Sequence, residues 1–97
     1  MTWVLQKQEK EGTYAFSGNI YMTRSVQEEI PFETVQKIIA TIHDLVIEQG
    51  GLDYLQVFVN EKGQKLFFID NLNEAMLKSG DYGKENNYAT LMFAHEY

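Results

Sequence analysis

The sequence of 97 residues contains no cysteine, one proline and one arginine, and the last two are Pro31 and Arg24. The lack of cysteine excludes disulfides, thiolate metal sites and cysteine nucleophiles. Basic residues are scarce: eight lysines and arginines stand against fourteen acidic residues, for a net charge of −6. Binding to a phosphate backbone needs clustered lysines and arginines, so we expect no direct contact with nucleic acid.

Long apolar runs are missing as well. No run approaches the roughly 18–20 residues that span a bilayer. The apolar patch near the N-terminus covers only Trp3 to Leu5, which is too short for a signal peptide. We therefore expect a cytoplasmic protein without membrane contact. The hydrophobic fraction of 44% and the charged fraction of 23% are typical of a folded chain, and the length fits a single domain over residues 1–97.

Residues 32–49 show the clearest pattern, that of an amphipathic helix. Pro31 fits the first helical position, where its missing N–H costs nothing. Gly50 suits the left-handed conformation at the helix end. The apolar stripe consists of Val35, Ile38, Ile39, Ile42, Leu45 and Val46. Such a stripe predicts that the helix packs across an apolar sheet face.

Residues 52–59 and 64–69 are rich in β-branched and aromatic residues and predict two strands. Residues 60–63 join them as a tight hairpin turn. The alternating residues that we expect to be buried are Leu55, Val57 and Val59. The opposite face then carries Tyr54, Gln56 and Phe58. Because this second face is only partly polar, we expect it to be covered or to form an interface.

The N-terminal part predicts further short strands. Residues 12–24 indicate two strands with a tight turn at residues 17–19. Residues 1–17 form an N-terminal extension or an edge hairpin, with strand character near residues 3–6. Residues 21–31 are then predicted to contain the end of the second strand, a polar turn and the proline that starts the helix.

The C-terminal part predicts a short helix and a last strand. Asn71 followed by Glu74 resembles a capping box and indicates a helix over residues 72–79. Residues 88–97 return to strand character. The predicted fold class is therefore α+β: a mostly antiparallel sheet of four to six strands with the long helix packed on one face.

Few residues suggest catalysis or a cofactor. His43 and His95 are the only histidines, and their separation fits no metal-binding motif. Glu28 and Glu29 are adjacent, so on an extended segment they point in opposite directions and do not converge on a substrate. No serine lies in a nucleophile elbow. We predict a protein that is not an enzyme and holds no cofactor or metal.

Arg24 is the most distinctive polar residue. An arginine just before a helix can contact a carboxylate or a phosphate through two parallel hydrogen bonds. The structural alternative is an internal bridge to Glu28, Glu29 or Glu96, and we favour it because acidic partners are local and abundant.

Three blocks of the sequence carry a resemblance to a known family. They are YMTRSVQEEIPFE at residues 21–33, LDYLQVFV at 52–59 and TLMFAHEY at 90–97. Together they resemble an uncharacterised family of small proteins from Gram-positive bacteria, domain-of-unknown-function family nine hundred and sixty, although Ser25 stands where glycine is usual. Members are often encoded on phages, plasmids and conjugative elements. The resemblance therefore implies a role in contacts with host proteins.

The predicted function is a non-enzymatic protein-interaction module that binds a protein partner and forms a homodimer through the sheet face with Tyr54 and Phe58. The first alternative is an acidic inhibitor that mimics nucleic acid. It requires one acidic face built from Glu28, Glu29, Glu33, Asp44 and Glu48. The second alternative is a ligand-binding or enzymatic domain. It requires a pocket where the side chains of four residues converge, namely Arg24, Tyr54, Gln56 and Tyr97.

Overall fold

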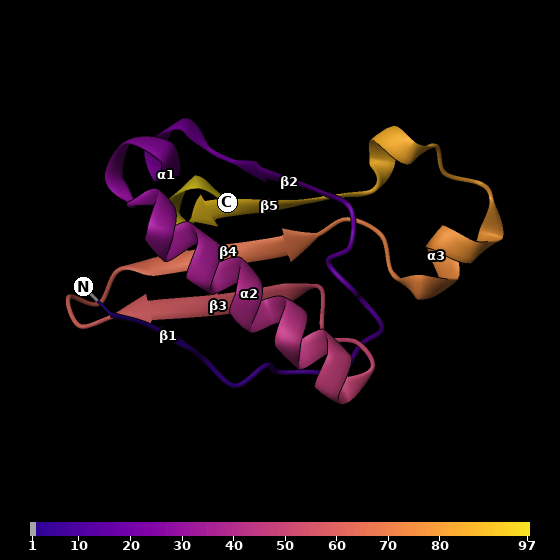
Figure 1. Ribbon diagram of the computed structural model, residues 1–97, viewed down its shortest axis with the longest axis horizontal. Coiled ribbons are helices and arrows are strands. Elements are labelled where there is room, and N and C mark those ends of the chain that lie inside the picture. The colour runs from indigo at the N-terminus through magenta and orange to yellow at the C-terminus, as the bar shows by residue number, and fades with distance from the viewer. Residues whose placement is uncertain (1) are drawn as a thin grey trace.

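The computed structural model describes residues 2–97 as one five-stranded mixed sheet with helices against one face (Figure 1). The strand order is β1-β3-β4-β5-β2, and only the pair β5-β2 is parallel. The strands are β1 (Trp3–Leu5), β2 (Asn19–Met22), β3 (Leu55–Asn60), β4 (Lys65–Asp70) and β5 (Tyr88–Phe93). The helices are α1 (Arg24–Glu29), α2 (Phe32–Gln49) and α3 (Glu74–Ser79), with short 3-10 turns at Lys84–Asn86 and Ala94–Glu96. This confirms the predicted α+β class.

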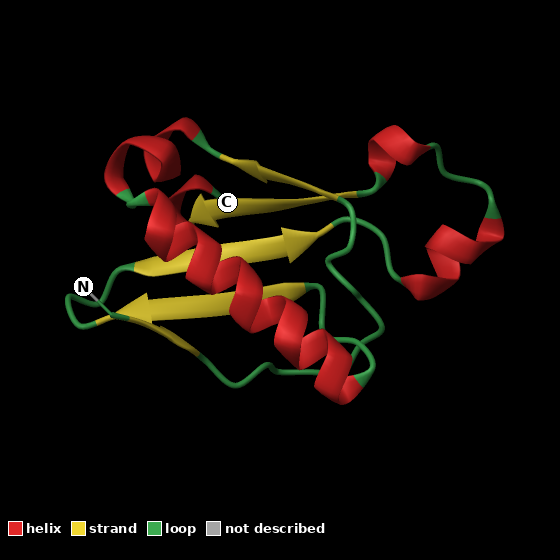
Figure 2. Cartoon of the chain, in the orientation of Figure 1, coloured by secondary structure: helices red, strands yellow, loops and turns green. Residues whose placement is uncertain are grey.

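Helix α2 lies diagonally across the sheet, as its apolar stripe predicts (Figure 2). Val35, Ile38 and Ile42 are buried against the sheet. Gly50 ends the helix with a φ of 76°, the left-handed conformation that glycine accepts without strain. Pro31 lies one position before the predicted one: it is the N-cap residue, and its carbonyl accepts the N–H groups of Thr34 and Val35. No helix of residues 2–97 is long and apolar enough to cross a bilayer.

The predicted orientation of β3 is wrong. Gln56 and Phe58 face α2 and are 2% exposed, whereas Leu55, Val57 and Val59 lie on the opposite face. Both sets are largely apolar, so their sequence alone did not distinguish the two faces. Phe58 fills the core together with Phe68 and Leu66 of β4. The Gln56 amide is tolerated there because it donates to the carbonyl of Asp53 and to the side chain of Gln8, at 2.9 and 3.1 Å.

Residues 12–24 do not form the predicted pair of strands. Only β2 forms, and it pairs in parallel with β5. Tyr14 makes a single antiparallel bridge to Leu52 instead. Gly12 fits this crossing because a Cβ there would lie 2.4 Å from the carbonyl oxygen of Leu52. The chain therefore crosses the end of the sheet before β2 begins, so the two segments cannot form a hairpin. Of residues 1–17, β1 is the edge strand, as the strand character near residues 3–6 predicts.

Two short helices depart from the prediction at their starts. Residues 24–29 form helix α1 rather than a polar turn, because the hydroxyl of Thr23 caps the N–H of Val26. Helix α3 is capped by Asn73, whose side-chain oxygen accepts the N–H of Met76 at 2.9 Å. Asn71 instead bonds the carbonyl of Asn86, so the apparent capping box with Glu74 does not form.

Phe16 is held in the core by contacts with Asp70 and Phe68 of β4 and with His43 of α2. It is fully buried with a φ of 50°, an unusual conformation for a bulky residue. Its N–H donates to Oδ2 of Asp70 at 2.8 Å, and its carbonyl lies 2.9 Å from Nε2 of His43. Its ring packs 4.9 Å from that of Phe68. Removal from water raises the pKa of Asp70 despite the backbone N–H donors around it.

Candidate interaction surface

Arg24 has an internal partner. Its Nε lies 3.0 Å from Oε1 of Glu28, four residues later on α1, and both side chains are largely exposed. Glu29 lies beyond this pair at the end of the helix, close to Lys65 and His95 around a shallow depression. An exposed ion pair of this kind contributes only about 0–1 kcal/mol to stability. Arg24 thus forms its ion pair within α1, at the surface of the protein.

Thr23 and Glu96 make the further link between this segment and the end of β5. Oε1 of Glu96 accepts the hydroxyl of Thr23 and the N–H of Phe93, both at 2.9 Å. The backbone N–H of Phe93, with a smaller contribution from Thr23, lowers the pKa of Glu96. Glu96 therefore bonds Thr23, next to Arg24, rather than Arg24 itself, which pairs with Glu28.

The other predicted site residues separate into different parts of the fold. Tyr54 and Tyr97 come together, and the phenol of Tyr97 raises the pKa of Tyr54 through its charge and a side-chain hydrogen bond. Gln56 and Phe58 are buried on the α2 side of the sheet. Arg24 pairs with Glu28, so the four residues of the proposed pocket do not converge. Phe58 belongs to the core and cannot form part of an interface.

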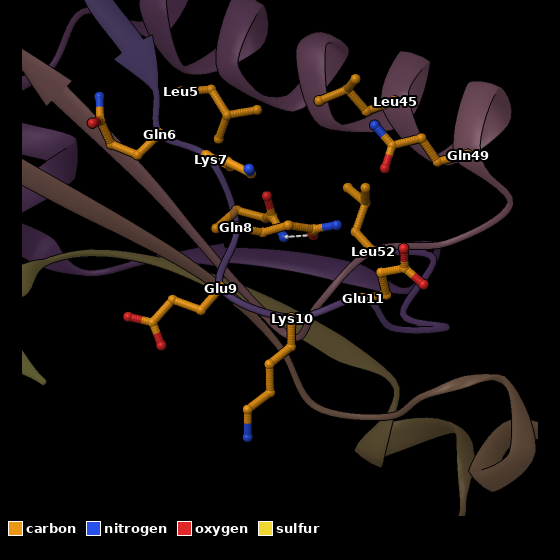
Figure 3. Close-up of a pocket in the computed structure, with 11 residues that line it drawn as sticks. Leu5, Gln6, Lys7, Gln8, Glu9, Lys10, Glu11, Leu45, Gln49 and Leu52 are labelled. Carbon is orange, nitrogen blue, oxygen red and sulfur yellow. Dashed lines mark hydrogen bonds between the residues drawn. The ribbon is translucent and has the colours of Figure 1, made fainter.

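A depression of about 640 Å³ lies between residues 6–11 and the C-terminal end of α2 (Figure 3). Leu45 and Leu52 form one side of it, and Gln8 points inward from the other. Oε1 of Gln8 already accepts the N–H of Asp53 and the amide of Gln56. The lining mixes amides, both signs of charge and leucines without a convergent set of polar groups. Within residues 2–97, no cluster of three histidine, aspartate or glutamate side chains could hold a metal ion.

The face of the sheet opposite α2 has a different character. Val26 of α1 and Ile30, the residue that follows this helix, belong to the same core as α2. Helix α3, which buries none of its residues, lies beyond one end of the sheet. Among residues 2–97, no α-helix therefore covers this second face (Figure 2), and of the C-terminal segment Tyr97 lies against Phe67 on it. We call it the open face. It is formed by Val4, Asn19, Tyr21, Leu55, Val57, Val59, Lys65, Phe67, Ile69, Tyr88, Thr90 and Met92.

The open face is apolar and aromatic. Lys65 is its only charged residue. Tyr21 and Tyr88 contact each other across β2 and β5, with ring centres 5.7 Å apart. Tyr97 stands edge-on to Phe67 at 5.7 Å and is 73% exposed. Exposed tyrosine and phenylalanine next to aliphatic residues are typical of protein interfaces.

A groove of about 350 Å³ runs along one side of the open face. Leu55, Val57 and Val59 form its floor, and residues 6–10 form one wall. The open face is thus not flat: its groove has an aliphatic floor and a polar rim that includes Lys7, Glu9, Lys10 and Asp53.

The carboxylates named for the acidic alternative do not form an unbroken surface. Glu33, Asp44 and Glu48 are exposed along the side of α2 that faces away from the sheet. Lys37 and the 83% exposed side chain of Ile47 lie on the same side. Glu28 belongs to α1 and is paired. The arrangement is typical of a solvated helix face.

Comparison of the chain with protein-family models, with curated proteins and with solved structures found no match. The resemblance to the Gram-positive family therefore stays a prediction. Sequence reasoning recognised an apolar second face but assigned it to the wrong residues. A usable signal existed: Leu55, Val57 and Val59 are aliphatic without interruption, whereas the face with Gln56 holds polar groups that only specific hydrogen bonds allow inside.

Proposed function

We propose that the protein is a non-enzymatic interaction module that acts in the cytoplasm and binds another protein molecule through its open face. The observation that carries the proposal is a largely apolar sheet surface to which the strands contribute one lysine and no carboxylate, in a chain with a net charge of −6. Glu9 and Asp53 lie at the rim of its groove, so the centre of this surface is poorly suited to contact with water alone. Large apolar patches on soluble proteins mark sites of interaction.

Aromatic residues supply the anchors that such a contact needs. Tyr21 and Tyr97 are 52% and 73% exposed, and both rest on another aromatic ring. Tyrosine gives a large contact area with little loss of rotamer freedom, which is why it dominates many binding surfaces. The proposal therefore assigns the binding energy to Tyr21, Tyr97 and the aliphatic residues of the open face.

The test is affinity capture with paired variants. Wild-type protein, Val57→Lys and Ile47→Lys are immobilised in equal amounts, and proteins retained from the source cells are compared. Val57 lies on the open face and Ile47 on the outer side of α2, so the two variants carry the same change on opposite surfaces. We expect Val57→Lys to lose the retained proteins and Ile47→Lys to keep them. Equal retention by all three proteins contradicts the proposal.

A further inference from the structure

We propose that the peptide bond between Tyr82 and Gly83 is a site of proteolytic modification, cut by an endopeptidase that prefers an aromatic residue before the bond, and that the fold survives the cut. Hydrolysis consumes a water molecule and breaks the bond between the carbonyl carbon of Tyr82 and the nitrogen of Gly83. It leaves a carboxylate on Tyr82 and an amine on Gly83. The site lies away from the open face, so it adds a modification to the proposed function.

Tyr82 lies in the connection between β4 and β5, which projects beyond one end of the sheet (Figure 1). We call residues 73–86 of this connection the arm. Neither of its helical segments, α3 and the 3-10 turn at Lys84–Asn86, contains a buried residue. Segments with few buried apolar contacts open at low free energy, because opening exposes little apolar surface. We therefore expect the arm to open locally while the sheet stays folded.

The bonds at the base of the arm limit this opening. The N–H of Glu74 donates to the carbonyl of Thr13 at 3.1 Å, and the side chain of Asn71 donates to the carbonyl of Asn86 at 2.7 Å. Behind them, the N–H of Asn71 donates to the carbonyl of Tyr88 at 3.0 Å. Opening of the arm can therefore stop at its base, before it reaches the paired residues of β4 and β5.

Within the arm, the bond after Tyr82 is presented well to an endopeptidase. Residues 80–83 are exposed and belong to no helix or strand. Among residues 2–97, no hydrogen bond involves the N–H or the carbonyl of Tyr82. Extended peptides are bound through main-chain hydrogen bonds, so these free groups can pair with an endopeptidase at once. The Tyr82 side chain is 48% exposed and can enter a specificity pocket.

Exposed aromatic residues in other segments are held by regular structure or by their backbone bonds. Tyr21 lies in β2, which pairs with β5. Phe32 lies in the first turn of α2. The carbonyl of Tyr54 accepts the N–H of Asp70 at 3.0 Å. Cleavage at any of these residues requires parts of the sheet or of α2 to unfold, so we expect the first cut after Tyr82.

After the cut, β5 stays in the sheet without its covalent link to β4. It lies between β4 and β2 and is hydrogen-bonded to both. Its buried side chains are those of Ala89, Leu91 and Phe93. The product is therefore a two-chain protein, and the hold on its shorter chain, which carries β5, is entirely non-covalent.

Limited digestion of the purified chain with chymotrypsin tests the inference. We expect mass spectrometry to find the first cut after Tyr82. The two fragments should elute together in size-exclusion chromatography and separate in concentrated urea. Tyr82→Ala is expected to slow the first cut at least about tenfold, and the control Phe32→Ala, which also replaces an exposed aromatic residue, to leave it within about twofold.

A further variant distinguishes local opening from unfolding of the whole chain. Val35→Ala weakens the core under α2. Cleavage through local opening does not depend on global stability, so the rate of the cut at Tyr82 should stay within about twofold of wild type in Val35→Ala and in low urea. A first cut elsewhere in the chain would overturn the site. Acceleration at least about tenfold by Val35→Ala, or fragments that separate without urea, would overturn the local opening or the survival of the fold.

Discussion

Asp70 is expected to stabilise the fold chiefly by holding Phe16, and Asp70→Ala measures that role. The substitution leaves the N–H of Phe16 without its 2.8 Å acceptor in a fully buried position. The N–H of Asn71 also loses a bond to Asp70, but it keeps its bond to the carbonyl of Tyr88 at 3.0 Å. The N–H of Leu72, which is also buried and bonds the same carboxylate, loses that acceptor too. A stranded buried donor costs about 1–3 kcal/mol. Loss of the desolvated carboxylate offsets part of this, because its burial is unfavourable.

We therefore expect Asp70→Ala to lower the free energy of unfolding by about 1–3 kcal/mol in urea denaturation, with an unchanged m-value. Asp44→Ala removes an exposed carboxylate from α2 and should stay within about 0.5 kcal/mol of wild type. Amide hydrogen exchange at Phe16 should accelerate more in Asp70→Ala than exchange at Ile42 in the core. A loss below 0.5 kcal/mol, or unchanged exchange at Phe16, would refute the reasoning.

Three further outcomes follow from individual contacts. The raised pKa of Asp70 means that the folded state binds the carboxyl proton more tightly than the unfolded chain does. As the pH falls from 7 through that raised value toward 3.8, the wild type should therefore gain stability relative to Asp70→Asn. The same pH dependence of stability for both proteins in urea melts would contradict this. Arg24→Ala should change the free energy of unfolding by less than about 0.5 kcal/mol, because its ion pair with Glu28 is exposed. A loss above about 1.5 kcal/mol in the same melts would show that Arg24 stabilises the fold more than an exposed ion pair can. Tyr97→Phe should lower the pKa of Tyr54 toward 10.0, since both the charge and the hydrogen bond of the Tyr97 phenol are removed; ultraviolet titration of the phenolates checks this, and an unchanged alkaline titration would disagree.

The elements that the sequence predicts well are those whose signals are local. Helix α2 carries an apolar stripe, an acidic first turn and a glycine stop, and all act within the segment itself. The hairpin between β3 and β4 is equally local, with Gly63 at a φ of 79° in the turn. These features need no knowledge of distant contacts, so the long helix and the central strands could be predicted.

The features that were mispredicted depend on distant contacts. β2 pairs with β5, which lies more than sixty residues later in the chain, so no turn signal could reveal it. The orientation of β3 is decided by the aromatic residues that α2 covers and by the hydrogen bonds that Gln56 donates to Gln8 and Asp53. Phe58 was placed at an interface for the same reason. The candidate surface could therefore be predicted in kind, as an apolar sheet face, but not in its residues.

Site-specific photo-crosslinking in cells tests most directly whether the open face is the surface that binds. A photoreactive phenylalanine analogue replaces Thr90 on the open face or, as the matched control, Thr41 on the exposed side of α2. We expect illumination to join the Thr90 variant to another protein molecule, either a second copy or a different chain, which mass spectrometry identifies, and to leave the Thr41 variant largely free. Adducts formed at Thr41 and not at Thr90 would contradict the account.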